Sequence, residues 1–270
     1  MHKTLLVVCG TSTDVGKTYI SGQLLSHFLL NGYIVNSCKP VQTGTTDHTS
    51  PDLAEHIQIV QQNLSHLNNR EELIAKLKTK VEQVTYTYNL ATSPHVGEKL
   101  GHTETFTLSK IVQQTISLCL NNQDNQADLL LVELAGGVMS PVNLYQTNLE
   151  LIFALNQACK SNQINFILVL IADGALGSIS HTLSALNLLP QVDYLIYNSS
   201  KQNITTNEQK IINQTNFSYL EDLKQFYSNG DLDRNSVLKP VDNTYLIAQK
   251  LQNTQLVKFN SLDDLAQIII

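Results

Sequence analysis

Residues 9–18, CGTSTDVGKT, place glycine, lysine and hydroxyl side chains directly behind the apolar run at 5–8. The backbone N–H groups of such a turn, with the N-terminus of a following helix, bind the phosphates of a nucleotide. In this pattern Lys17 would contact the β- and γ-phosphates, and the Thr18 hydroxyl would ligate Mg²⁺. The stretch between the two glycines, 11–15, is one residue longer than in the common phosphate loop. The alternative interpretation is a plain turn before an ordinary helix.

A second candidate stretch, NSCKPVQTG at 36–44, carries a cation at the predicted end of a strand. We expect Pro40 to end this strand and to leave Lys39 at its tip. There, Lys39 is either a solvated end charge or a group that stabilises a second developing anion. Thr43 and Gly44 follow, and a small hydroxyl and a bare backbone suit contact with a compact substrate.

A third stretch, LLLVELAGG at 129–137, places Glu133 directly after a buried run. An acid in this position is typical of a Mg²⁺ ligand in phosphate-loop enzymes. The alternative is a strand-end carboxylate in water. If Glu133 is a Mg²⁺ ligand, the backbone near Gly136 would lie beside the same site.

A rival metal site is suggested by His48, Asp52 and His56, which lie four residues apart and are zinc-ligand types. Pro51 argues against it, because proline fits the first turn of a helix and leaves His48 outside that helix. We therefore interpret Asp52 as a helix-dipole partner or a Mg²⁺ ligand and expect both histidines to lie at the surface.

The elements that must position these groups are short apolar runs separated by stretches with helical spacing. This alternation predicts an α/β fold with a mostly parallel sheet flanked by helices, whose ligands bind beyond the carboxyl ends of the strands. We predict a single domain over 1–270, in which 199–270 carries no motif, and a polar surface segment at 200–235. The runs are at 5–8, 34–38, 128–132, 165–172 and 193–197.

Composition limits the classes of function. The chain has 270 residues, 42% of them hydrophobic and 15% charged, which is too apolar for a disordered protein. The formal net charge of -6 disfavours a nucleic-acid or anionic-membrane surface, so an anionic ligand must be bound by local cations. The four cysteines show no metal-binding spacing, and no run has the length of a membrane helix. We expect a cytoplasmic protein with reduced cysteines.

Together these stretches resemble the dethiobiotin synthetase family. The family's lengthened loop, G-T-x-T-[ED]-V-G-K-T, is similar to 10–18 with Asp14 at the acidic position, and K-P-V-x-[ST]-G is similar to 39–44. An aspartate that opens the next helix corresponds to Asp52. Further resemblance lies in TSPH at 92–95, VELAGG at 132–137, LGSISH at 176–181 and Asn198.

The resemblance implies a P-loop NTPase-like fold and an ATP- and Mg²⁺-dependent synthetase. It would close a ring on 7,8-diaminopelargonate with CO₂, through a carbamate and a carbamic-phosphoric anhydride. It further implies a homodimer whose active site lies at the subunit interface. The resemblance implies that the catalytic residues are Lys17, Lys39 and Thr43, and that Mg²⁺ is ligated by Thr18, Asp52 and Glu133. It implies ATP contacts at Thr13, Asp14, Val15, Gly16, Lys17, Thr18, Tyr19, Glu133, Gly136 and Asn198. It implies diamine contacts at Thr43, Gly136, Leu176, Gly177 and Ser178.

The chain also departs from the family pattern. Leu134 stands where the family has glycine, which matters if that backbone needs a positive φ. Ser199 stands where aspartate is common, and residues 60–85 read as inserted or remodelled. Two other functions stay open: another ATP-dependent amidoligase, such as a cobyrinate-amidating type, and a nucleotide-switch ATPase. The second is disfavoured because switch ATPases often carry an extra lysine early in the loop, and none lies at 10–16.

Overall fold

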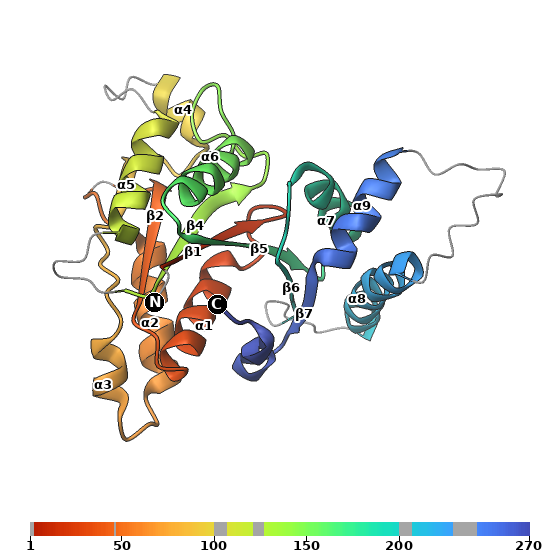
Figure 1. Ribbon diagram of the computed structural model, residues 1–270, viewed down its shortest axis with the longest axis horizontal. Coiled ribbons are helices and arrows are strands. Elements are labelled where there is room, and N and C mark those ends of the chain that lie inside the picture. The colour runs from red at the N-terminus through yellow and green to blue at the C-terminus, as the bar shows by residue number, and fades with distance from the viewer. Residues whose placement is uncertain (1–2, 46, 100–106, 121–126, 200–206, 229–241) are drawn as a thin grey trace.

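The computed structural model describes residues 3–45, 47–99, 107–120, 127–199, 207–228 and 242–270. Its centre is a seven-stranded parallel sheet in the order β3-β2-β4-β1-β5-β6-β7 (Figure 1). This confirms the predicted α/β fold. The strands are β1 (Thr4–Gly10), β2 (Val35–Thr43), β3 (Val84–Tyr88), β4 (Leu129–Gly137), β5 (Asn165–Asp173), β6 (Tyr194–Asn198) and β7 (Gln255–Phe259).

Helices cover both faces of the sheet (Figure 1). One layer contains α1 (Lys17–Leu30), α2 (Pro51–Leu64), α3 (Arg70–Ala75) and the short 3-10 helix η1 (Leu262–Gln267). The other contains α5 (Leu108–Leu120), α6 (Asn148–Ser161), α7 (Ser178–Leu188), α8 (Asn207–Ser228) and α9 (Asp242–Asn253). A further short helix, α4 (Pro94–Lys99), precedes α5.

The central strand β1 explains why two layers form. Leu5 and Val7 pack into the core under α5 and α6, whereas Leu6 and Val8 pack into the core under α1. All four side chains are fully buried. A strand buried on both faces reads as a continuous apolar run, which is why this element was recognisable from its sequence.

Two strands were missed by sequence reasoning. Both β3, with the sequence VTYTY, and β7, with the sequence QLVKF, lie at the edges of the sheet. An edge strand is partly solvated, so it lacks the unbroken apolar run of the central strands. Because β7 pairs with β6, part of the motif-free stretch 199–270 completes the same sheet.

The prediction that Pro40 ends its strand is wrong, since β2 continues through Pro40 to Thr43. Pairing of β2 with β4 ends at Cys38, and pairing with β3 begins at Lys39. Proline has no N–H to donate, so it is tolerated where β2 parts from one neighbour and keeps the other. Lys39 consequently lies inside a strand rather than at its tip.

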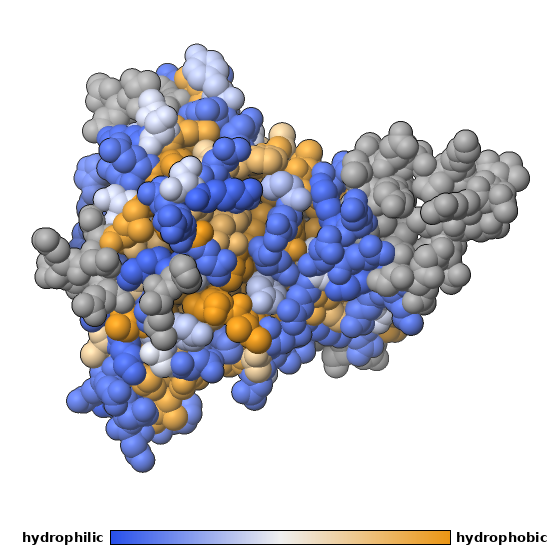
Figure 2. Space-filling view, in the orientation of Figure 1, coloured by the Kyte–Doolittle hydropathy of each residue, from blue (hydrophilic) through white to orange (hydrophobic). Residues whose placement is uncertain are grey.

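Where the structure describes the predicted surface segment at 200–235, residues 207–228 form α8, a helix that sequence reasoning did not predict. Phe217 and Leu220 of this helix are buried in the core beside Tyr197. The cysteines are free and buried. Among the described helices, none combines the length and apolar character needed to cross a membrane. In the space-filling view, apolar residues gather in the middle of the face shown, and hydrophilic residues dominate its rim (Figure 2).

Candidate active site

The predicted phosphate loop joins β1 to α1 and has a backbone shaped for close approach. Gly16 caps α1 with φ 89°, and Asp14 takes φ 60° although it is not glycine. A Cβ on Gly10 would lie 2.7 Å from the Ser12 carbonyl oxygen and 3.1 Å from Lys17 Nζ. Glycine is therefore needed at Gly10 for space and at Gly16 for conformation.

Lys17, the first residue of α1, is 7% exposed, and its Nζ donates a hydrogen bond to the Ser12 carbonyl at 3.1 Å. Burial lowers the pKa of Lys17 below its ordinary value, Glu133 opposes this shift, and the positive charge of Lys39 adds to it. A nearby polyanion stabilises the charged form of such a buried ammonium, because the anion replaces the hydration that burial removes.

Lys39 pairs with two carboxylates that come from different elements. Its Nζ lies 2.9 Å from Glu133 Oε1 and also contacts Asp52 in the first turn of α2. Lys39 is 5% exposed. Burial would lower the pKa of Lys39, but Glu133 and Asp52 outweigh burial and raise it. The side chain is therefore a charged ammonium at neutral pH.

Glu133 is fully buried at the point where β4 bulges away from β1: Val8 pairs with Glu133, and Gly10 pairs with Gly137. Its Oε1 accepts from Lys39 and also from Thr18 Oγ1 at 2.9 Å. Burial raises the pKa of Glu133, but Lys39 and a histidine hydrogen bond reverse this and hold it well below the ordinary range. The bulge aims this carboxylate across the sheet edge toward α1 and α2.

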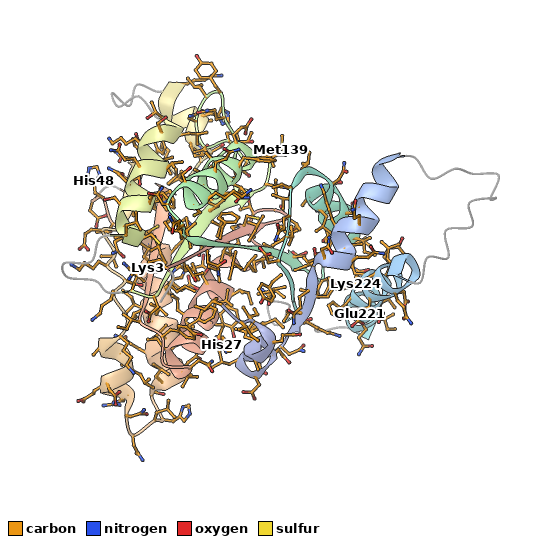
Figure 3. The ribbon with its side chains drawn as sticks, viewed as in Figure 1. Lys3, His27, His48, Met139, Glu221 and Lys224 are labelled. Carbon is orange, nitrogen blue, oxygen red and sulfur yellow. The ribbon has the colours of Figure 1, made fainter. Side chains whose placement is uncertain are left out.

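The expectation that both histidines of the rival zinc site lie at the surface is wrong for His56. His56 is fully buried on α2, and its Nε2 lies 2.7 Å from Glu133 Oε2. His48 lies outside α2 as predicted, with its Nδ1 2.9 Å from Thr87 Oγ1, at the edge of the molecule (Figure 3). The two imidazoles therefore belong to different environments and share no face.

A cavity of about 650 Å³ opens between the phosphate loop, β2, α2 and the end of β4. It brings together the lysines, carboxylates and loop residues that the sequence predicted, and it adds Gln42, Glu55 and Ala135. The predicted residues in its wall are Thr13, Asp14, Gly16, Lys17, Thr18, Tyr19, Lys39, Thr43, Asp52, Glu133 and Gly136.

Other predicted residues are not among the described residues that line this cavity. Val15 is a buried residue of the loop, and its carbonyl accepts a hydrogen bond from Asn198 Nδ2 at 3.0 Å. Asn198 at the end of β6 therefore supports the loop from below. Leu176, Gly177 and Ser178 lie where β5 leads into α7, with Leu176 87% exposed and Ser178 buried.

Leu134 does not strain the backbone in the position where the family pattern has glycine. It is not among the described residues with positive φ, and its side chain is 2% exposed within the core. The neighbouring Gly136 does take φ 75°, and a Cβ there would lie 2.3 Å from Ser140 Oγ. In this stretch, Gly136 is therefore the residue whose positive φ requires glycine.

The oxygen atoms in the cavity fit a hard divalent cation. The Thr18 hydroxyl donates to Glu133 Oε1, and the Asp52 carboxylate meets the same Lys39 ammonium as Glu133. Mg²⁺ is usually held by one or two carboxylates and keeps water and phosphate oxygens as its other ligands. Within the described ranges, no group of three or more His, Cys, Asp or Glu side chains is placed to hold a metal ion. The fit to Mg²⁺ rests on the Thr18 hydroxyl and on the carboxylates of Asp52 and Glu133.

The amino-acid sequence is similar to a protein family and to several known proteins. The family described as "AAA domain" matches residues 4–220. The ATP-dependent dethiobiotin synthetase BioD of Caulobacter sp. is 32% identical over 183 residues, which is 67% of this chain and 68% of that protein. BioD 2 of Pasteurella multocida is 31% identical over 71% of this chain and 79% of that protein. BioD 2 of Haemophilus ducreyi is 28% identical over 83% of this chain and 94% of that protein.

Proposed function

The chain belongs to the ATP-dependent dethiobiotin synthetase family, and we propose that it forms dethiobiotin for biotin biosynthesis at the expense of ATP. One observation carries the proposal: Lys17 and Lys39 line the same cavity, although they come from different elements. The reaction needs concentrated positive charge, because it brings a carbamate and a triphosphate together in a protein of net charge -6.

The proposed substrates are 7,8-diaminopelargonate, CO₂ and ATP. One amine takes up CO₂ and loses a proton to give a carbamate. A carbamate oxygen then attacks the γ-phosphorus, and ADP leaves. The second amine attacks the carbonyl carbon of the resulting carbamic-phosphoric anhydride and loses a proton, and phosphate leaves as the ring closes. Each step needs its partners held in line, which is the main contribution of a phosphoryl-transfer site.

In this proposal the two lysines have different tasks. Lys17 binds the β- and γ-phosphates from the start of α1, while the loop N–H groups around Gly16 bind the remaining phosphate oxygens. Lys39 bridges the carbamate and the γ-phosphate, so that two anions can approach without mutual repulsion. Its backbone is held inside β2, and its raised pKa keeps the side chain charged.

Thr18, Asp52 and Glu133 would hold Mg²⁺, which when bound neutralises charge on the phosphate oxygens. The other residues that we propose for ATP binding are Thr13, Asp14, Val15, Tyr19, Gly136 and Asn198. In this scheme Val15 and Asn198 act by holding the loop in shape, given their hydrogen bond beneath it.

The diamine would be oriented by Thr43 and the backbone at Gly136, which both line the cavity. We propose a homodimer in which Leu176, Gly177 and Ser178 of the second subunit receive the substrate's carboxylate at the start of α7. Two exposed apolar side chains support a surface that the second subunit covers. Leu176 is 87% exposed, and Met139, which is labelled in Figure 3 and lies in the loop after β4, is 54% exposed. A cytoplasmic location, where ATP and bicarbonate are supplied, is part of the proposal.

A phosphate-release assay with ATP and bicarbonate, run with and without 7,8-diaminopelargonate, tests the function. We expect release only when the diamine is present, together with a product whose mass is that of dethiobiotin. Diamine-independent release would contradict the proposal and favour a nucleotide-switch ATPase. Release that requires ammonia or glutamine instead would favour an amidoligase.

A further inference from the structure

The carboxylate of Glu133 is held from two sides by different kinds of donor. Its Oε1 faces the cavity and accepts from Lys39 and Thr18. Its Oε2 faces away and accepts from His56 Nε2 at 2.7 Å. The exposed fraction of both Glu133 and His56 is 0%, so water does not substitute for either contact.

A line of hydroxyl groups continues behind His56. Ser37 Oγ lies 3.1 Å from His56 Nδ1 and 3.0 Å from Thr79 Oγ1. An ionised carboxylate only accepts, so His56 Nε2 carries a proton and donates it to Glu133. In the neutral imidazole Nδ1 is then an acceptor; Ser37 would donate to it and accept from Thr79, because a hydroxyl has one proton.

We propose that His56 is a positioning residue, which fixes the Glu133 carboxylate through Oε2 so that Oε1 stays directed at the cation site. The inference rests on the proposed function, because that function assigns the cation to Thr18, Asp52 and Glu133. The proposed function also has Lys39 contact the carbamate and the γ-phosphate, so its ion pair with Glu133 is lost when it turns to these anions. The His56 contact does not depend on that change, and it keeps a buried carboxylate hydrogen-bonded throughout.

The same contact gives a role to part of the remodelled stretch 60–85. The backbone N–H of Lys78 donates to the Val35 carbonyl at 2.8 Å, and the Ser50 N–H donates to the Val81 carbonyl at 2.9 Å. These bonds tie the segment around Thr79 to β2 and to the cap of α2. The segment therefore supports the Ser37 end of the line, and groups one helical turn apart on α2 serve the same cation site: Asp52 from the cavity and His56 from behind.

Two substitutions of His56 separate its hydrogen bond from its bulk. His56→Leu removes the donor to Oε2 at similar volume, whereas His56→Gln keeps an N–H near the place of Nε2. The readout is Mn²⁺ affinity in the presence of a non-hydrolysable ATP analogue, measured from the electron paramagnetic resonance signal of free Mn²⁺. We expect His56→Leu to weaken Mn²⁺ binding by roughly 10- to 100-fold, the usual effect of removing a group that orients a metal ligand. His56→Gln should restore most of that affinity, and Ser37→Ala should fall between them.

Ile59→Ala is the matched control. Ile59 is buried on the same helix and packs toward Gly22 of α1, and its aliphatic side chain has no proton to donate to Glu133. The substitution should lower the melting temperature while Mn²⁺ affinity stays at the wild-type value. Metal-free nucleotide affinity should be unchanged in all variants.

The inference would be overturned if His56→Leu bound Mn²⁺ as tightly as the wild-type chain. It would also be overturned if His56→Gln lost as much affinity as His56→Leu, or if Ile59→Ala lost affinity in proportion to its stability. A wild-type chain that bound no Mn²⁺ with the nucleotide would remove the cation site and this inference together. The diamine-dependent release of phosphate judges the proposed function separately, because it is measured on the wild-type chain alone.

Discussion

Lys39 Nζ lies 2.9 Å from Glu133 Oε1, the same oxygen atom that accepts the Thr18 hydroxyl. Lys39 inside β2 and Glu133 inside β4 thus form a buried ion pair at the place where a cation would bind. Two positive groups cannot share one carboxylate oxygen without repulsion. Glu133 and Asp52 would hold a divalent cation in place of Lys39, and the Lys39 ammonium would then face the reacting anions.

Removal of Lys39 should separate chemistry from nucleotide binding. We expect Lys39→Ala to leave ATP affinity within about tenfold of wild type and to reduce turnover by at least about a hundredfold, or roughly 2.7 kcal/mol of barrier. Breaking a buried pair also leaves a carboxylate uncompensated, so stability should fall by about 3 kcal/mol. Isothermal titration calorimetry, steady-state phosphate release and urea unfolding give the three values. Activity within about tenfold of wild type would contradict the role of Lys39.

Removal of Lys17 should affect ATP affinity itself, in contrast to removal of Lys39. Its ammonium donates to a loop carbonyl and has its pKa lowered first by burial, so a triphosphate is its natural counter-charge. We expect Lys17→Ala to weaken ATP itself, by about 1.5–3 kcal/mol for the lost charged hydrogen bond. Because burial lowers the pKa of Lys17 in the free enzyme and the bound phosphates raise it, ATP affinity should fall as pH rises through the free-enzyme pKa. Unchanged affinity in calorimetry would rule out this contact.

The ion pair also predicts how stability depends on pH. The pKa of Glu133 is lowered from 4.5, so its contribution is present above that value and is lost as pH falls below it. The pKa of Lys39 is raised from 10.5, so its contribution is present below that value and is lost as pH rises through the folded-state pKa.

Glu133→Gln tests the acid side of this window, because glutamine resembles the protonated acid. The wild-type chain should be more stable than Glu133→Gln by about 3 kcal/mol at neutral pH. That difference should shrink as pH falls below 4.5, the ordinary pKa of glutamate. Urea unfolding followed by circular dichroism at a series of pH values measures it, with Glu55→Gln at the exposed cavity rim as the control. A difference that stays constant with pH would contradict the pair.

Much of the site was accessible from sequence because its residues follow apolar runs that form central strands. The phosphate loop after β1 could be placed by the rule that parallel strands direct their carboxyl ends to one edge, and the same rule brought Lys39 and Glu133 to the correct cavity. The predicted strand ends were wrong for both residues: β2 continues past Lys39 to Thr43, and β4 continues past Glu133 to Gly137. A proline is read as a strand end unless the position of the neighbouring strand is known, and β3 was not predicted.

His56 was missed for a different reason. Its spacing from Asp52 showed that the two share a helix face, but the sequence did not show that this face packs against Glu133. Burial of a histidine depends on a partner from another element, here the β4 bulge. Hydrogen-bond partners that join residues 77 positions apart are set by tertiary structure and leave no local pattern.

Two glycines offer a test of loop shape with a built-in control. A Cβ on Gly10 would lie 2.7 Å from the Ser12 carbonyl oxygen and 2.9 Å from Val15 Cγ2, so Gly10→Ala must displace the loop. Gly32 takes φ 89°, and no atom of the described residues lies within 4 Å of a Cβ added there, so Gly32→Ala adds backbone strain alone. We expect each to lower stability, by about 1–2 kcal/mol for Gly32→Ala, and only Gly10→Ala to weaken ATP binding, by about tenfold or more. Calorimetry with ATP and thermal unfolding measure both. Equal ATP affinity in the two variants would mean that the phosphates do not bind where β1 meets α1.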